Sequence, residues 1–301
     1  MIYNFLNKKE GQDIIAKKDE LLENMNEFER SLKMRTDKLI GEKEYEEFLK
    51  DNVLPWKKKE REKVKESLDE LNRLLKDLSL NIDEEIHIVK TTGREEFNSA
   101  YTRMNTIFLP QRRIEAYNNL GLTKFLAHEL FHIISRNNFN LRKKLYEVIG
   151  FKLVNNIKLP EKYLKRRMTN PDAPLINSYI TVLHKKRKVK VTPVILLKDD
   201  YENISDDKDI LKKLDLKLLV LEDIEGKLRV KYKKDEPVCL DFVKVDGFLD
   251  KVGANTDSSI QPEEILAENF ALLITGYQDV PSPLIIEKMK DILIKELNEN
   301  A

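Results

Sequence analysis

The sequence contains one cysteine, only four histidines and no long apolar run. Because Cys239 has no second cysteine to pair with, an intrachain disulfide is excluded, and a lone cysteine is compatible with a reducing cytosol. No stretch approaches the roughly 20 consecutive apolar residues that a membrane-spanning helix needs, so we expect no such helix. Stability must therefore come from a packed core and from any bound metal.

The N-terminus lacks a charged start followed by an apolar run of signal-peptide length. We therefore expect a cytoplasmic protein, and secretion by a signal-independent route stays open. Charged residues make up 36% of the chain but nearly cancel to a net charge of +1, so neither nucleic acid nor an anionic membrane is indicated as a partner. The basic run at residues 185–188 has no second basic cluster beside it and predicts a solvated hairpin tip.

Residues 1–82 are predicted to be helical and rich in charge. An apolar stripe with steps of three and four residues runs along residues 64–78, as expected for a helix that packs in a local bundle. A partner-binding coiled coil is the alternative, but two heptads are too few to favour it. Pro55 breaks the pattern and predicts a turn between helices.

The pattern changes to mixed helix and strand after residue 82, which predicts an α+β protein. Residues 85–90 and 100–109 alternate like strands, and residues 178–245 predict two hairpins followed by a further strand at 238–245. Helices are predicted again at 261–276 and 283–297. We divide the chain into a helical N-terminal region (1–82), a core (83–174), a β-rich insertion or second lobe (175–250) and C-terminal helices (251–301).

Residues 123–136, TKFLAHELFHIISR, predict a helix that is apolar on nearly every side and therefore buried. His128, Glu129 and His132 nevertheless lie in its middle. Burying a carboxylate and two imidazoles among aliphatic side chains is costly unless they are paired or bound to a metal.

The spacing of these residues favours a metal. His128 and His132 are four residues apart, so both imidazoles project from one face and can share a zinc ion. Glu129 is turned about 100° around the helix axis, which places it beside the metal as a base rather than as a ligand. The alternative is a pair of core histidines satisfied by hydrogen bonds.

The H-E-x-x-H string formed by His128, Glu129 and His132 resembles the signature of the zincin metallopeptidases. The resemblance implies a zinc-dependent peptidase with one Zn²⁺ per chain, a peptide or protein substrate, and Glu129 as general base. It also implies a zincin-like core in which a sheet edge beside the zinc takes the substrate as an extra strand. Residues 101–109 are the candidate edge, and an ordinary internal strand is the equal alternative.

A catalytic zinc needs a third protein ligand. The metzincin pattern is excluded, because Ser135 occupies its glycine position and Asn138 its third histidine position. His87 and His184 are both expected to be structural or surface residues. Glutamates on a second helix remain as candidates.

The segment from Glu264 to Ala271, EILAENFA, resembles the second helix of the gluzincins. The resemblance implies that Glu264 is the third zinc ligand and that Glu268 accepts a hydrogen bond from a zinc-bound histidine. If Glu264 points toward the zinc, the adjacent Glu263 is expected to point away from it. Glu147 is the alternative ligand, but it lacks a paired acid downstream. Glu264 follows His132 by 132 residues, a longer interval than gluzincins usually show, so we interpret the β-rich segment as an insertion.

Two functional alternatives stay open. One is a non-catalytic, zinc-binding regulatory or interaction protein, and the other is a toxin or effector protease that uses its helical N-terminal arm to hold one protein target. Tyr179, His184 and Tyr277 are open candidates for the residue that stabilises the oxyanion. The sequence does not predict the cleavage specificity, the choice of endo- or exopeptidase action, or the oligomeric state.

Overall fold

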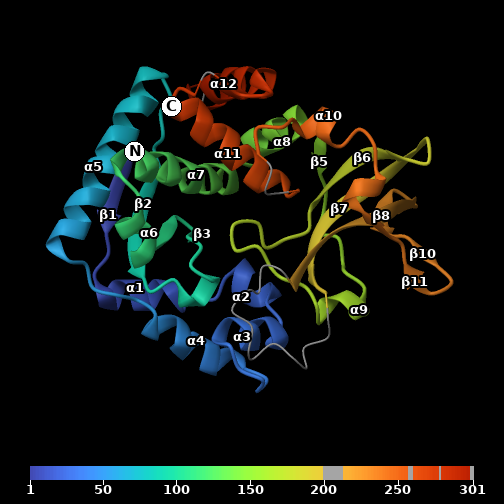
Figure 1. Ribbon diagram of the computed structural model, residues 1–301, viewed down its shortest axis with the longest axis horizontal. Coiled ribbons are helices and arrows are strands. Elements are labelled where there is room, and N and C mark those ends of the chain that lie inside the picture. The colour runs from blue at the N-terminus through green and yellow to red at the C-terminus, as the bar shows by residue number, and fades with distance from the viewer. Residues whose placement is uncertain (199–212, 257–259, 278, 299–301) are drawn as a thin grey trace.

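The computed structural model describes residues 1–198, 213–256, 260–277 and 279–298. It shows a mixed α+β protein in which a helical half with a small sheet stands beside a larger antiparallel sheet (Figure 1). None of the described helices combines the length and the apolarity needed to cross a bilayer. Residues 199–212, which belong to the predicted β-rich segment, lie outside the described residues.

The smaller sheet has four strands in the order β1 (Ile2–Phe5), β2 (Glu85–Thr91), β4 (Thr106–Pro110) and β3 (Tyr101–Arg103). The first three are parallel, and β3 returns antiparallel to β4. Side chains of β2 and β4 are almost all buried, as expected for strands covered on both faces. The strand predicted at 85–90 is confirmed.

Three predictions of local structure are wrong in this chain. Residues 2–5 form a strand rather than a helix, because they pair with β2, a partner that local periodicity does not reveal. The strand predicted at 100–109 is split by a turn at Met104, where φ is 50°. Of its two parts, β4 is internal and β3 lies at one edge of the sheet. The strand predicted at 238–245 ends at Asp241 and continues as a short 3₁₀ turn, Phe242–Lys244.

Five helices form most of the N-terminal region: α1 (Lys8–Ile15), α2 (Glu20–Asn24), α3 (Glu27–Met34), α4 (Glu42–Asp51) and α5 (Lys58–Asp77). The predicted stripe on α5 is buried at Val64, Leu68, Leu71 and Leu75. Through it α5 packs against α7 (Asn119–Asn137), while α1 and α4 pack against each other. The stripe is therefore buried as predicted, but it packs on the core helix α7 and not in a bundle with α1–α4.

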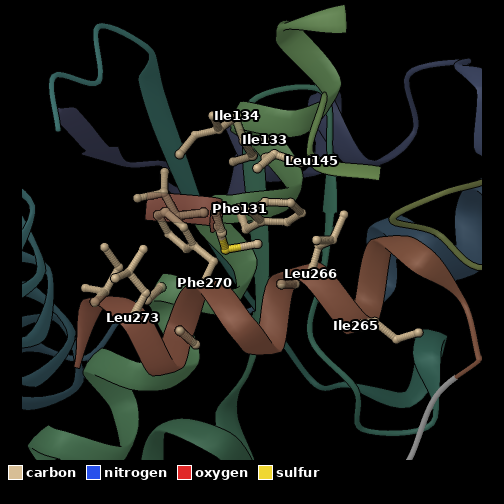
Figure 2. Close-up of a cluster of buried hydrophobic side chains, with 14 of the residues drawn as sticks. Phe131, Ile133, Ile134, Leu145, Ile265, Leu266, Phe270 and Leu273 are labelled. Carbon is tan, nitrogen blue, oxygen red and sulfur yellow. The ribbon is translucent and has the colours of Figure 1, made fainter. Parts of the chain in front are cut away.

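The centre of the helical half is the contact between α7 and α11 (Pro262–Ile274). Apolar side chains of both helices meet face to face in Figure 2, and the rings of Phe131 and Phe270 lie 5.6 Å apart. α6 (Gln111–Ala116) precedes α7, and α8 (Phe139–Val148) follows it and packs against α12 (Pro283–Asn298). Asn118 caps α7 by accepting a hydrogen bond from the Gly121 amide.

The larger sheet is antiparallel, with the order β12 (Cys239–Asp241), β8 (Leu214–Ile224), β7 (Arg187–Leu197), β6 (Ser178–His184) and β5 (Phe151–Leu153). A further strand, β9 (Lys227–Val230), pairs with β8. Both predicted hairpins, β6–β7 and β8–β9, are confirmed. A small β10–β11 hairpin (Tyr232–Lys233 and Glu236–Pro237) and two short helices, α9 (Glu161–Leu164) and α10 (Leu249–Val252), complete this half.

A buried ion-pair group connects α3 to the loop of residues 169–174. Lys33 lies between Glu29 and Glu96, and its side chain is fully buried. Glu29 in turn accepts hydrogen bonds from the backbone N–H of Thr169 at 3.0 Å and from its hydroxyl at 2.8 Å. The N-terminal helices therefore fix one end of this loop, which is called the 169–174 loop below.

We predict that Lys33→Met destabilises the fold by about 3–5 kcal/mol, because it leaves two buried carboxylates without their cation. The matched control is Lys38→Met, whose partner Glu44 is exposed; it should change the free energy of unfolding by less than about 1 kcal/mol. Urea unfolding followed by circular dichroism measures both. Equal effects of the two substitutions would contradict the role given to Lys33.

Candidate metal centre

Helices α7 and α11 bring together the three residues predicted to bind zinc. His128 and His132 lie one turn apart on α7, and Glu264 lies in the first turn of α11. One ligand atom from each of the three lies within 4.8 Å of the other two. Glu147, the alternative ligand, is exposed on α8 and does not belong to this group.

The separations within the group fit a tetrahedral zinc site. The Nε2 atom of His128 is 3.3 Å from Glu264 Oε2, and the Nε2 atom of His132 is 3.9 Å from Glu264 Oε1. Ligand atoms bound tetrahedrally at zinc bond lengths are separated by about 3.4 Å. Small side-chain adjustments would therefore suffice for all three to bind one ion.

His132 gives an independent reason to place a cation here. Its side chain is fully buried, and neither ring nitrogen has a hydrogen-bond partner among the described residues. The nearest carboxylate to Nδ1 is Glu263, at 3.5 Å. Since buried polar atoms are normally satisfied, the free Nε2 on the side of Glu264 points to a ligand that completes the site.

The surrounding charges also favour a cation between these residues. Burial alone would lower the pKa of the His132 imidazole, but the carboxylates of Asp172 and Glu264 outweigh it and raise the pKa to about 9. Burial likewise opposes ionisation of Glu264, yet the imidazoles of His132 and His128 lower its pKa to about 2. Glu264 is therefore ionised, and the neighbouring carboxylates favour a positive charge on both imidazoles.

Glu129 lies beside this group. The side chain is only 3% exposed, and its Oε2 atom is buried with no hydrogen-bond partner among the described residues. Burial, together with the neighbouring Asp172 carboxylate, raises its pKa to about 8 against the opposing effect of the two imidazoles. A carboxylate with this basicity can take up a proton near neutral pH.

Two further carboxylates lie near the Nδ1 atoms of the two imidazoles, on the side of each ring away from Glu264. Glu268 Oε2 lies 3.8 Å from His128 Nδ1, and its other oxygen accepts a hydrogen bond from Lys124 at 2.6 Å. Glu263 faces the opposite edge of the His132 ring from Glu264 and accepts hydrogen bonds from Tyr146 (2.7 Å) and Ser135 (3.1 Å). Sequence analysis expected Glu263 to point away from the metal and did not indicate its contact with His132. The signal was its position next to Glu264, since adjacent residues are turned about 100° apart on a helix.

The 169–174 loop supplies two residues that sequence analysis missed. The Asn170 amide donates a hydrogen bond to Glu264 Oε1 at 2.7 Å. Asp172 forms a second group with Glu129 and His132, in which one ligand atom from each lies within 4.8 Å of the other two. The Asn, Pro and Asp residues of this segment are typical of a turn, and no spacing rule connects Asn170 and Asp172 to the H-E-x-x-H string.

The edge strand β3 is already hydrogen-bonded on its outer side. Asp172 Oδ1 accepts from the backbone N–H and the hydroxyl of Thr102, each at 2.7 Å. The Arg136 guanidinium donates to the carbonyls of Thr102 (3.2 Å) and Met104 (2.8 Å). Of the candidate substrate edge at residues 101–109, only β3 lies at an edge of the sheet. The side chains of Asp172 and Arg136 already occupy the outward N–H and carbonyl of Thr102 on this strand.

The remaining candidates lie outside the two groups. His87 on β2 is near Glu85, and His184 Nδ1 lies 3.1 Å from the Lys244 carbonyl at the end of the β6–β7 hairpin. Tyr179 is on β6, next to Lys190. The third oxyanion candidate, Tyr277, is exposed, and its ring lies 5.4 Å from Lys124, the partner of Glu268.

Comparisons with protein-family models, with curated proteins and with solved structures find no match to this chain. The site's own residues provide two imidazoles and a carboxylate around one point, a buried carboxylate beside it, and a further carboxylate within 3.8 Å of Nδ1 of each ring.

We predict that Glu264→Ala removes bound zinc while Glu147→Ala leaves it in place, because only Glu264 lies within ligand distance of both imidazoles. Elemental analysis of the purified proteins after zinc loading and desalting should give about one zinc per chain for the wild type and for Glu147→Ala. A zinc content unchanged by Glu264→Ala would exclude this ligand set.

Glu263→Gln should weaken zinc binding by roughly 10- to 100-fold, because the carboxylate beside His132 Nδ1 orients the ring and strengthens it as a ligand. Competition with a coloured chelator measures the affinity, and circular dichroism checks that the variant is folded. Glu147→Gln is the matched control. A folded Glu263→Gln variant with wild-type affinity would show that this contact is only structural.

Proposed function

We propose that the protein is a zinc-dependent peptidase with a zincin-like core built around α7 and α11. The observation that carries the proposal is the meeting of His128, His132 and Glu264 at ligand separations, with the buried base Glu129 beside them. In this proposal the larger sheet is an insertion between the two zinc-binding helices.

His128, His132 and Glu264 would hold the zinc ion, and Glu268 and Glu263 would orient the two imidazoles. When bound, zinc supplies Lewis-acid activation of a water molecule and of the substrate carbonyl. The ionised state of Glu264 suits this role, because its negative charge offsets part of the charge of the ion.

Glu129 performs the proton transfers. Its carboxylate takes a proton from the attacking water as the water oxygen bonds to the carbonyl carbon. The same proton then passes to the leaving nitrogen as the carbon–nitrogen bond breaks, which regenerates the carboxylate. The unpartnered Oε2 atom of Glu129 is the acceptor best suited to this transfer.

Two features favour this function over the alternatives. A protein that only holds zinc has no need of a buried and unpartnered carboxylate beside the metal, because such a group costs stability. The N-terminal helices pack onto the rest of the chain through α5 and α7 instead of extending as a separate arm. This packing weakens the interpretation of that region as an exosite of a toxin or effector protease.

We predict that Glu129→Gln keeps its zinc and loses peptide cleavage by at least about 100-fold, because the amide cannot accept the proton. Glu147→Gln, the same change at an exposed site on the neighbouring helix, should cleave like the wild type. Mass spectrometry of a digested peptide library measures cleavage, and elemental analysis measures zinc. A Glu129→Gln variant as active as the wild type would exclude this base, and a zinc-loaded wild type that cleaves nothing would exclude the peptidase.

A further inference from the structure

Asp172 is the charged residue of the site that the proposed reaction does not use. It comes from the 169–174 loop, and its carboxylate lies within 4.8 Å of Glu129 and His132. One oxygen, Oδ1, accepts both hydrogen bonds from Thr102. Asp172 therefore places a second carboxylate beside Glu129, and the steps of the proposed reaction give this carboxylate no role.

The loop that carries Asp172 is held at several points. Thr169 is bound by the buried Glu29, and Asn170 donates to Gln261 (2.9 Å) and to Glu264 (2.7 Å). The Asp172 amide donates to Asn170 Oδ1 at 2.9 Å. Asp172 is thus a fixed part of the site, and its place beside Glu129 is set by the fold.

Asp172 also blocks the candidate substrate edge at Thr102, the middle residue of β3. An extended peptide that adds to β3 needs the outward N–H and carbonyl of Thr102 for its main-chain hydrogen bonds. Asp172 and Arg136 already occupy both groups. The main chain of a substrate therefore cannot pair with β3 beside Asp172, which disfavours an internal peptide segment at this place.

Two carboxylates lie close together at this place. Glu129 Oε2 is buried without a hydrogen-bond partner among the described residues, and one oxygen of Asp172 lies within 4.8 Å of the Glu129 carboxylate. The nearby Arg136 makes its described hydrogen bonds to carbonyls and to the Thr102 hydroxyl, so these bonds do not engage the Asp172 carboxylate. A positively charged group bound next to Asp172 would offset the repulsion between the two carboxylates.

We propose that Asp172 binds the free α-ammonium group of a peptide substrate, so that the enzyme removes residues from the N-terminus. This inference rests on the peptidase function proposed above and adds the substrate class to it. One extended residue spans about 3.4 Å. Only a single residue therefore fits between an ammonium group at Asp172 and a carbonyl at the metal centre, which makes the first peptide bond the one cleaved.

A lysine or arginine side chain of an internal residue is the competing occupant of the place beside Asp172. Binding it would make the enzyme an endopeptidase with a preference for basic residues. That arrangement requires the main chain to continue past Thr102, where the strand edge is already hydrogen-bonded. The structure therefore favours the terminal ammonium, and the two occupants give different products.

The test uses the full-length, zinc-loaded protein and a randomised hexapeptide library in two forms, one with free amino termini and one N-acetylated. We expect single residues to be released from the free library and no cleavage of the acetylated library, as read by mass spectrometry. Cleavage of interior bonds in acetylated peptides would overturn the inference and leave the proposed peptidase intact. Failure to cleave either library would overturn the peptidase function and this inference with it.

The variant Asp172→Asn removes the charge but keeps an oxygen that can accept the hydrogen bonds from Thr102. We expect kcat/KM for the free peptides to fall by about 10- to 100-fold, as for the loss of a charge-assisted contact. The control is Glu147→Gln, the removal of an exposed acid on α8 that does not belong to the site, and it should behave like the wild type.

A binding measurement separates substrate recognition from chemistry and from metal binding. Calorimetry on zinc-loaded Glu129→Gln should show weaker binding of N-acetylated than of free peptides, and adding Asp172→Asn should remove most of this preference. Asp172→Asn alone should keep one zinc per chain. Loss of zinc would instead make Asp172 a metal ligand and overturn the inference, as would an unchanged preference in the double variant.

Discussion

The structure depends on the packing of α7 against α11, two helices that are apolar on almost every side. Their buried contact, seen in Figure 2, joins segments that are far apart in the sequence. Large apolar areas on both helices leave water when they meet, and this gain offsets the cost of burying charge at the same contact. The imidazoles of α7 and the first-turn acids of α11 are thereby held at one place.

Each imidazole at this contact lies between two carboxylates. His128 has Glu264 on one side and Glu268 on the other, while His132 lies between Glu264 and Glu263. All three acids come from α11, so a single helix determines which ring nitrogen faces the centre. The acids are ionised in this setting, because nearby cations and hydrogen-bond donors lower the pKa of each against the effect of burial.

The sequence predicts the part of this site that is local. His128, Glu129 and His132 stand out because three polar residues interrupt one apolar helix, and Glu264 stands out through the resemblance of its own helix. Asn170 and Asp172 could not be found in this way, since their roles depend on where a loop lies in the folded chain. β1 was missed for the same reason: its strand character comes from pairing with β2, far away in the sequence.

The larger sheet acts on the site through this loop. The chain entering it pairs with the end of β7, where the amide of Met168 donates to the Ile195 carbonyl and that of Leu197 to the Arg166 carbonyl. The helical half holds the 169–174 loop from the other side, through hydrogen bonds of Glu29 with Thr169 and of Thr102 with Asp172. A loop fixed from both halves keeps Asp172 beside Glu129 at little further entropic cost, because its backbone is already ordered. The sheet that lies between α7 and α11 in the sequence is therefore part of the site's construction, because it helps to hold the loop that contacts residues of both helices.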